Sequence, residues 1–480
     1  YLWLVFSKKD RPKAETRWYV ALGIALRVLL LFSIPNLSDD VYRFLWDGHL
    51  TVAGIHPFAH PPVYFIENQI FPPGITPALF AKLNSPGYFT VYPPVCQAVF
   101  ALAAWLGQES TWAGVFVMKL FLLGCEVGTI WLLGIRDWGL VGGSGSRQWQ
   151  IKETSSSSQS PIPNPQSPIP TPQYLISNPQ SPIPTPQYLI SNPQSPIPTP
   201  QLIYALNPLI LLEITGNCHF EGAMIFFLLA GLWALERNRV KQAALWWALA
   251  TAAKLLPLMF VPIVWRWLGW RKGLVFNTVF AGACMILFAP LLSVLPNILS
   301  SLDLYFQKFQ FNASVYYLLR ELGFWIKGYD IGESLGPVLG LATVVGVLWL
   351  NPTPSPSPTG RGDVESTATS SVMSSTERST APLPVGEGLG VGLNHALLLA
   401  LLLQLSLSAT VHPWYATVPF AIGLLTKWRF PLVWTGLVAL SYSHYADGHF
   451  QENYWLIALE YSILWAFILW ETGHLTVRRS

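Results

Sequence analysis

The chain of 480 residues is 52% hydrophobic and only 11% charged, with a mean hydropathy of +0.40. Soluble domains carry about 25% charged residues, so most of this surface must face something other than water. Aromatic residues make up 14%, and 22 of them are Trp, which is enriched at membrane–water interfaces. This composition excludes a cytosolic enzyme, a disordered protein, a coiled coil and a disulfide-stapled secreted domain, and a net charge of +3 argues against a nucleic-acid partner.

Long apolar runs predict an all-α fold, a polytopic transmembrane helix bundle. A bilayer core of about 30 Å requires about 20 apolar helical residues. Shorter runs come in two pairs, 203–215 with 222–236 and 243–255 with 256–267, and predict broken or hairpin helices around a polar cavity. Together they predict roughly 11–13 spans. The longer runs are 17–36, 91–107, 112–135, 273–292, 333–350, 393–411, 430–446 and 455–472.

Two segments lack membrane character. Residues 141–201 repeat SPIPTPQYLISNPQ from Ser167 and again from Ser181, and such frequent Pro excludes a helix. Residues 351–392 are rich in Pro, Ser, Thr and Gly without a period. Both are predicted to be disordered linkers. They separate an N-terminal transmembrane region (residues 1–140), a central transmembrane region (residues 202–350) and C-terminal transmembrane helices (residues 393–480). The opening run at Tyr1 is interpreted as the tail of a further span, since no basic segment precedes it.

The basic residues near the ends of the apolar runs predict the orientation. Cytoplasmic loops carry an excess of Lys and Arg. Placing the basic clusters in the cytoplasm leaves two large loops, 37–90 and 293–332, on the extracytoplasmic side. If 91–107 crossed the membrane, the later clusters would change sides, so this run is predicted to be re-entrant or wrongly bounded. The clusters are Lys8, Lys9, Arg11 and Lys13; Arg237, Arg239 and Lys241; Arg266, Arg271 and Lys272; Lys427 and Arg429; Arg478 and Arg479.

The first large loop opens with SDDVYRFLWDG, which predicts a short helix capped by Ser38. Asp39, Arg43 and Asp47 are four residues apart and share one helical face. A surface ladder of ion pairs accounts for that spacing, but the adjacent acids Asp39 and Asp40 favour a second interpretation. One acid can cap the helix and pair with Arg43, while the other faces a cavity as a general base.

Polar groups also stand inside apolar runs further along the chain. The turn GNCHFEG carries His219 and Glu221, and AAKLLPL carries Lys254. A Lys at the bilayer centre costs at least about 2.5 kcal/mol, so it usually faces a cavity or an anionic partner. Snorkelling to the interface is the alternative. Arg27 and Glu126 are equally costly and are expected to pair with each other.

Two later segments complete the candidate site. Residues 305–323, with Lys308, Asn312 and Arg320, are amphipathic and predict a helix lying in the interface, with its cations near head-groups or a lipid phosphate. The segment at His412, Trp414 and Tyr415 ends the run 393–411 and is explained equally well as an aromatic belt.

In this order the segments resemble the GT-C superfamily of integral-membrane glycosyltransferases, and most closely the polyprenyl-phosphate-mannose-dependent mannosyltransferases of glycosyltransferase family 87. The resemblance covers most of the chain outside the two linkers. The most specific part of the resemblance is the segment at 38–58, the first of the six segments that carry it. They are SDDVYRFLWDG with HPF at 38–58, YPPV at 92–95, NPLILLE with GNCHFEG at 207–222, AAKLLPL at 252–258, FQFNASVYYLLRELG at 309–323 and HPWY at 412–415.

The resemblance implies transfer of a sugar, expected to be mannose, from a polyprenyl-phosphate donor to an extracytoplasmic hydroxyl of a glycan, lipid or protein. It implies a single inverting displacement with Asp39 or Asp40 as the catalytic base, and the sequence leaves that choice open. The substrate-binding residues expected are Arg43, Asp47, His219, Glu221, Lys254, Asn312, Arg320, His412, Trp414 and Tyr415. The chain has Asp-Asp and no Asp-x-Asp here, so no metal ligand is assigned and the use of a divalent metal stays open.

A transporter or flippase of lipid-linked sugars is the alternative function, because it shares broken helices and a cationic cavity. Transporters often contain two related halves, and no such internal symmetry is evident here. Release of free polyprenyl phosphate from a labelled donor separates the two functions.

Overall fold

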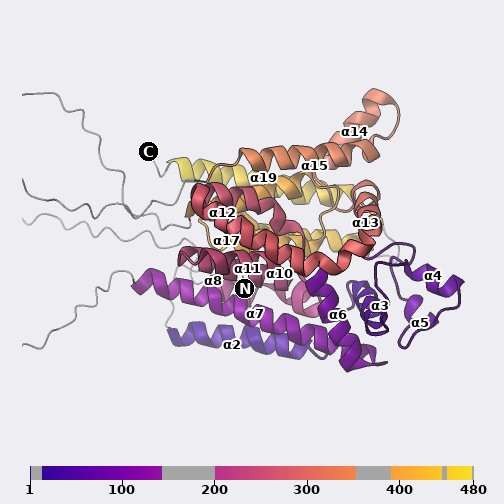
Figure 1. Ribbon diagram of the computed structural model, residues 1–480. Helices are drawn as coiled ribbons and strands as arrows, with labels where there is room; N and C mark the ends of the chain where they lie inside the picture. The colour runs from indigo at the N-terminus through magenta and orange to yellow at the C-terminus, as the bar shows by residue number, and fades with distance from the viewer. Residues whose placement is uncertain (2–12, 143–199, 353–390, 446–450, 478–480) are drawn as a thin grey trace, which may run out of the picture.

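The computed structural model describes residues 1, 13–142, 200–352, 391–445 and 451–477, and the description below concerns these residues. They form an all-α bundle in which the long helices lie roughly parallel or antiparallel to one another (Figure 1). Both predicted linkers, with the Pro-rich repeat, fall almost wholly outside the described residues. The helices of the N-terminal region are α2 (Lys13–Leu30), α3 (Asp40–Val52), α4 (Pro62–Glu67), α5 (Pro77–Phe80), α6 (Pro94–Gly107) and α7 (Thr111–Gly142).

The central region contains most of the short helices. It consists of α8 (Pro200–Ala205), α9 (Pro208–Ile210), the π-helix η1 (Leu211–Gly216), α10 (Glu221–Glu236), α11 (Val240–Ala253), the 3₁₀-helix η2 (Leu256–Phe260), α12 (Val261–Phe288), the 3₁₀-helix η3 (Ala289–Val294), α13 (Leu295–Lys308), α14 (Val315–Lys327) and α15 (Gly332–Trp349). The C-terminal region consists of α16 (Val391–Leu407), the 3₁₀-helix η4 (Pro413–Ala416), α17 (Thr417–Gly423), α18 (Phe430–Leu437), the 3₁₀-helix η5 (Val438–Tyr445) and α19 (Tyr454–Val477).

Four helical segments in the described part of the chain are long and apolar enough to cross a bilayer, namely Thr111–Ile135, Leu256–Ser301, Gly332–Trp349 and Tyr454–Gly473. A fifth is counted if Pro208–Gly216 and Glu221–Glu236, which meet at 111°, form one broken span. This count is below the roughly 11–13 spans expected from sequence. The physical reason is length: α11 has 14 residues, which at 1.5 Å each give about 21 Å, short of the roughly 30 Å core.

Both pairs of short helices take the broken or hairpin form expected of them. The first pair is η1 and α10, which bend at 217–220. The second is α11 followed by η2 and the first turns of α12. Pro257 stands in the first turn of η2, and Gly269 interrupts α12 with φ 71° and ψ 175°. A side chain with a Cβ is strained at such a φ, so Gly lets the chain turn there and start the longer part of α12.

The bundle has two distinct ends. Helices α3, α4 and α5 gather at one end together with α13 and α14 (Figure 1). This end, at which α3 begins, is called the Asp40 end below. The turn between α10 and α11 lies at the opposite end, because those helices form a hairpin whose other ends meet through Glu221 and Lys254. Lys272 Nζ donates to Asn238 Oδ1 at 2.8 Å, which places the basic turn after Gly269 beside the basic residues 237–241.

Helix α6 does not cross the bundle. Its first turn lies at the Asp40 end, where the Cys96 thiol donates to the carbonyl of Ala253 at 3.1 Å. Its last residue, Gly107, lies against Gly114 in the first turn of α7, and Trp112 Nε1 donates to the Phe32 carbonyl just beyond the end of α2. Both ends of α6 are therefore on the same side, as the distribution of basic residues had suggested for 91–107.

Buried polar contacts hold the N-terminal helices to the centre. Arg27 and Glu126 are fully buried and pair at 2.9 Å, as expected, while Arg27 also donates to the Ala205 carbonyl at 2.6 Å and the Thr215 hydroxyl donates to Glu126. The pair therefore links α2, α7, α8 and η1 and leaves neither charge unpaired in the apolar interior. Loop 53–93 packs against α3 in a small separate core, in which Phe65, Ile75, Leu79 and Leu83 of the loop contact Trp46 and Leu50 of α3.

Candidate active site at the Asp40 end

The first turn of α3 separates the roles of the two adjacent acids. Asp39, not Ser38, is the N-cap residue, and its exposed side chain makes no capping hydrogen bond. The Ser38 hydroxyl instead accepts from the Asp40 amide at 3.3 Å. Asp40 is half-buried, with 21% of its side chain exposed, and its Oδ1 accepts from Asn84 Nδ2 at 2.8 Å. Asn84 thereby leaves Oδ2 of Asp40 facing the interior of the bundle.

A histidine from the broken helix η1–α10 faces that oxygen. His219 Nε2 lies 3.9 Å from Asp40 Oδ2, and the ring is 2% exposed. The other ring nitrogen, Nδ1, lies 2.7 Å from Glu213 Oε2, and Glu213 also accepts from Tyr442 Oη and from Asn217 Nδ2. A π-helical turn, such as η1 around Glu213, is frequent at functional sites because it redirects side chains within a helix.

An aromatic stack forms the next wall. The His219 ring stacks on Trp414 with centroids 3.8 Å apart, and Trp414 stacks on His412 at 4.3 Å. Pro413 begins η4 and turns the chain so that these rings align. Burial lowers the pKa of His412 to about 4, an effect that the nearby Asp40 carboxylate opposes. His412 is therefore neutral at physiological pH.

The ion pair Glu221–Lys254 lies beside this cluster. Lys254 Nζ is 3.0 Å from Glu221 Oε1, and the ammonium also lies 5.5 Å from the centre of the Tyr92 ring. Glu221 is the first residue of α10 and Lys254 the C-cap of α11, so each charge suits the dipole of its own helix. Glu221 is 3% exposed, and its Oε2 has no hydrogen-bond partner among the described residues. The pair is thus a buried, partly unsatisfied charge centre.

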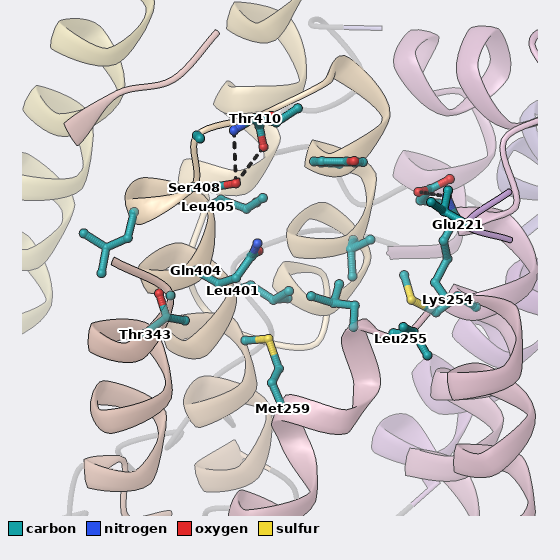
Figure 2. A pocket seen from close by; sticks show the side chains of 18 of the residues that line it. Glu221, Lys254, Leu255, Met259, Thr343, Leu401, Gln404, Leu405, Ser408 and Thr410 are labelled. Carbon is teal, nitrogen blue, oxygen red and sulfur yellow. Dashed lines mark hydrogen bonds and ion pairs between the residues drawn. The ribbon is translucent and has the colours of Figure 1, made fainter. Parts of the chain in front are cut away.

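An apolar cavity of about 440 Å³ opens at this ion pair (Figure 2). Glu221 and Lys254 form one wall, and the opposite wall carries Gln404, Thr343 and Ser408. The rest of the lining is mainly aliphatic and comes chiefly from η2, α15, α16 and α17, together with residues 91–93. A cavity of this kind suits a ligand with a hydrocarbon body and a charged end.

A second apolar cavity, of about 370 Å³, adjoins the first. The two share Val91, Pro93 and Leu255 as lining residues, and the second continues between these residues and the helices α12 and α13. The helices that line both cavities also face outwards with apolar side chains, such as Ile286 on α12 and Leu341 on α15, which are 78% and 65% exposed. Such surfaces are typical of contact with lipid.

Arg43 and Asp47 contact protein rather than a cavity. They pair at 2.9 Å with side chains 4% and 0% exposed, so this is a buried pair and not a surface ladder. Arg43 also donates to the carbonyls of Ser85 and Tyr88, and Asp47 accepts from Gln97 at 3.0 Å. Asp39 is outside this network. The pair therefore fixes α3 against α6 and the 85–88 turn, and in this way it positions Asp40.

The segment 309–323 is divided between two places. Phe311 forms a bridge with Thr410, and its ring lies 4.6 Å from the ring of His412, so it supports the stacked wall. Asn312 is buried behind it and donates to Glu452 and Glu460 at 2.7 and 3.2 Å. Arg320 lies on α14, which projects from the bundle in Figure 1, and pairs with the exposed Asp330. Arg320 also donates to Gln310, and the Asn312 carbonyl accepts from Tyr461, so none of the hydrogen bonds described for these two residues reaches Asp40 or Lys254.

The structure thus brings together Asp40, His219, Glu221, Lys254, His412, Trp414 and Tyr415, seven of the residues expected from sequence. Sequence reasoning missed Glu213, Tyr442, Asn84 and Tyr92 as site residues. A signal for Glu213 existed, because a carboxylate within LILLEIT is as costly in an apolar environment as Lys254. Tyr442 carries no such signal. Tyr92 lies among Asp40, Glu221 and Lys254, and burial raises its pKa, with Asp40 adding to the effect.

The donor set does not define a metal centre in the described part of the chain. There, no three His, Cys, Asp or Glu side chains converge in a way that could hold a metal ion. The four Cys residues are free.

Residues 180–376 match the model of glycosyltransferase family 87. The match covers less than half of the chain and is consistent with a GT-C-like glycosyltransferase. No curated protein matches the chain. The matched range contains η1 with Glu213, the turn with His219, and the Glu221–Lys254 hairpin.

Proposed function

We propose that the protein transfers a sugar, mannose in the first instance, from a polyprenyl-phosphate donor to the hydroxyl of an extracytoplasmic acceptor. The observation that carries the proposal is the position of Asp40. Its free oxygen faces His219, and its charge lies close enough to act on Lys254 and Tyr92, which line a cavity that is otherwise mainly apolar. A lipid-linked donor combines the matching features, an apolar tail and a charged phosphate end.

Asp40, rather than Asp39, is the base in this proposal. Asp40 is half-buried and held by Asn84, whereas Asp39 is exposed at the N-cap. Asp40 takes the proton of the acceptor hydroxyl as its oxygen attacks C1 of the sugar from the face opposite the phosphate. The C1–O bond breaks, its electron pair leaves with the polyprenyl phosphate, and the configuration at C1 inverts.

Lys254 stabilises the charge that develops on the leaving phosphate. An ammonium has three N–H donors, and Glu221 engages the one directed at its Oε1. The side chain is 25% exposed and lines the cavity, so further donors are available to a phosphate there. His412 and Trp414 then form the wall against which the sugar lies. Arg320, paired with Asp330 on α14, takes no part in this step.

The orientation of the protein in the membrane follows from the positions of its basic residues. The basic turns 237–241 and 266–272 lie at the end of the bundle opposite Asp40. With those turns in the cytoplasm, the Asp40 end is extracytoplasmic.

The test compares purified Asp40→Asn and Asp39→Asn in liposomes that contain polyprenyl-phosphate mannose with labelled mannose and an acceptor glycolipid. A general base contributes about 10²–10⁴ in rate, so D40N should lose that much turnover while D39N stays near wild type. Normal turnover in a folded D40N protein would remove the base assignment. Movement of the donor across the bilayer with no release of polyprenyl phosphate, in the wild type, would indicate a flippase.

A further inference from the structure

The pair Glu213–His219 stands behind Asp40 and has no role in the steps above. His219 contributes one ring nitrogen to each of two carboxylates, Nδ1 to Glu213 at 2.7 Å and Nε2 towards Asp40 at 3.9 Å. Two lone pairs at 2.7 Å would repel, so a proton lies between Nδ1 and Glu213 Oε2. Nε2 of the neutral ring is then an acceptor that faces Asp40.

The contacts of His219 differ from those of a residue that only fills space in the core. The ring is 2% exposed, yet neither ring nitrogen makes a hydrogen bond of normal geometry among the described residues, although Nδ1 lies 2.7 Å from Glu213 Oε2. A buried polar atom without a partner destabilises the folded chain. Such an atom aimed at a half-buried carboxylate is explained if the pair exchanges a proton during turnover. Hydrogen bonds of this type are often long before substrate binds.

We propose that Glu213 and His219 form a proton relay behind Asp40, in which Asp40 passes the proton of the acceptor hydroxyl to Nε2 of His219. The inference rests on the proposed function of Asp40. In the balanced step, the acceptor O–H bond breaks, its electron pair forms the bond to C1, and the phosphate leaves with the electron pair of the old bond. The proton moves to Asp40 and then to His219, and solvent removes it when the products leave.

The energetics favour this direction of transfer. The ordinary pKa values of Asp and His are about 3.9 and 6.5, so an imidazole holds a proton about 2.5 pH units more strongly than a carboxylate. Glu213 adds to this, since a carboxylate at Nδ1 fixes the tautomer and stabilises the imidazolium. Tyr442 and Asn217 hold Glu213 in turn. Glu213 is thus a positioning residue for His219, and His219 for Asp40.

Several charged or titratable groups surround His219 and share its electrostatic environment. Asp40 on α3, Glu213 on η1 and His412 before η4 lie next to it, Lys254 after α11 acts on His412, and Lys119 on α7 acts on Cys218, the residue before His219. Because His412 is neutral above about pH 4, it does not supply the charge change expected near neutral pH.

The test measures kcat and KM for the polyprenyl-phosphate mannose donor from pH 5 to 9. The variants are Glu213→Gln, Glu213→Asp and His219→Asn, and His60→Asn serves as the matched control because that His is exposed and stacks on Tyr64 instead. Glu213→Gln preserves shape, but its amide can donate to Nδ1 and so place the ring proton on Nε2, facing Asp40. We expect kcat to fall at least tenfold in E213Q and H219N, with KM nearly unchanged and partial recovery in E213D.

The relay needs Nε2 to be free of a proton when Asp40 takes the proton of the acceptor, so the pH profile of kcat in the wild type should differ from that of H219N. Imidazole in the buffer should restore part of the turnover of His219→Ala. Wild-type pH profiles in E213Q and H219N, a change confined to KM, or lack of imidazole rescue in a folded H219A protein would overturn the relay. If D40N is inactive in the same assay, such a result removes the relay alone; if D40N is fully active, the proposed function fails first.

Discussion

Removal of the Lys254 charge separates the structural role of the ion pair from its chemical role. Lys254→Met leaves Glu221, 3% exposed, as a buried carboxylate whose Oε2 already has no partner in the described part of the chain. Breaking a buried pair from one side costs about 3–5 kcal/mol. The double variant Lys254→Met/Glu221→Gln removes both charges, so most of that loss of unfolding free energy should be recovered.

Turnover should not recover with stability. If Lys254 stabilises the leaving phosphate, loss of one preorganised charge interaction costs about 10²–10³ in kcat, and the double variant keeps that defect. The assay pairs thermal unfolding in detergent with release of labelled polyprenyl phosphate. Arg320→Gln is the matched control, because its exposed pair with Asp330 contributes no more than about 1 kcal/mol and lies outside the proposed mechanism. A stable double variant with wild-type kcat would refute the role of Lys254, and an undiminished stability of K254M would refute the burial argument.

Three further predictions concern packing and pH. A Cβ at Gly48 would lie 2.2 Å from the Phe100 carbonyl oxygen, so Gly48→Ala should separate α3 from α6, lowering the melting temperature and the turnover together. Arg27→Met should destabilise the protein by about 3–5 kcal/mol in chemical denaturation, and Arg27→Met/Glu126→Gln should recover much of this; equal stability of single and double variants would contradict a buried pair. Burial lowers the pKa of His412 to about 4. In the unfolded chain His412 binds a proton below its ordinary pKa of about 6.5, whereas in the folded chain it does so only below about pH 4. Stability should therefore fall between about pH 6.5 and 4, and His412→Gln should make that fall smaller in pH-dependent unfolding.

The arrangement of the site explains why charged residues stand in a bundle that is otherwise apolar. Arg27–Glu126 joins helices, and Arg43–Asp47 supports the turn that holds Asp40. Of these three pairs, Glu221–Lys254 alone lines either of the two cavities described above. Burial of a charge pair is therefore not by itself a sign of function here, and the cavity distinguishes the pair proposed to act on substrate.

The sequence alone was sufficient for the class of fold and for several local features. Low charge and long apolar runs require an environment other than water, which is why the all-α bundle and the paired short helices were predicted correctly. The high cost of a lone charge in an apolar interior also predicted the partnership of Arg27 and Glu126, which are 99 positions apart. The resemblance to glycosyltransferase family 87 agrees with the match over 180–376.

Tertiary structure decided which of these polar residues meet. Asp39 and Asp40 are neighbours in sequence, but the start of α3 and the contact with Asn84 turn only Asp40 inwards. Arg320 and Lys254 are both cations in apolar surroundings, yet the first pairs with Asp330 on a projecting helix and the second lines the cavity. The physical reason is that solvation cost depends on composition and can be judged along the chain, whereas the direction of a side chain depends on contacts between helices distant in sequence.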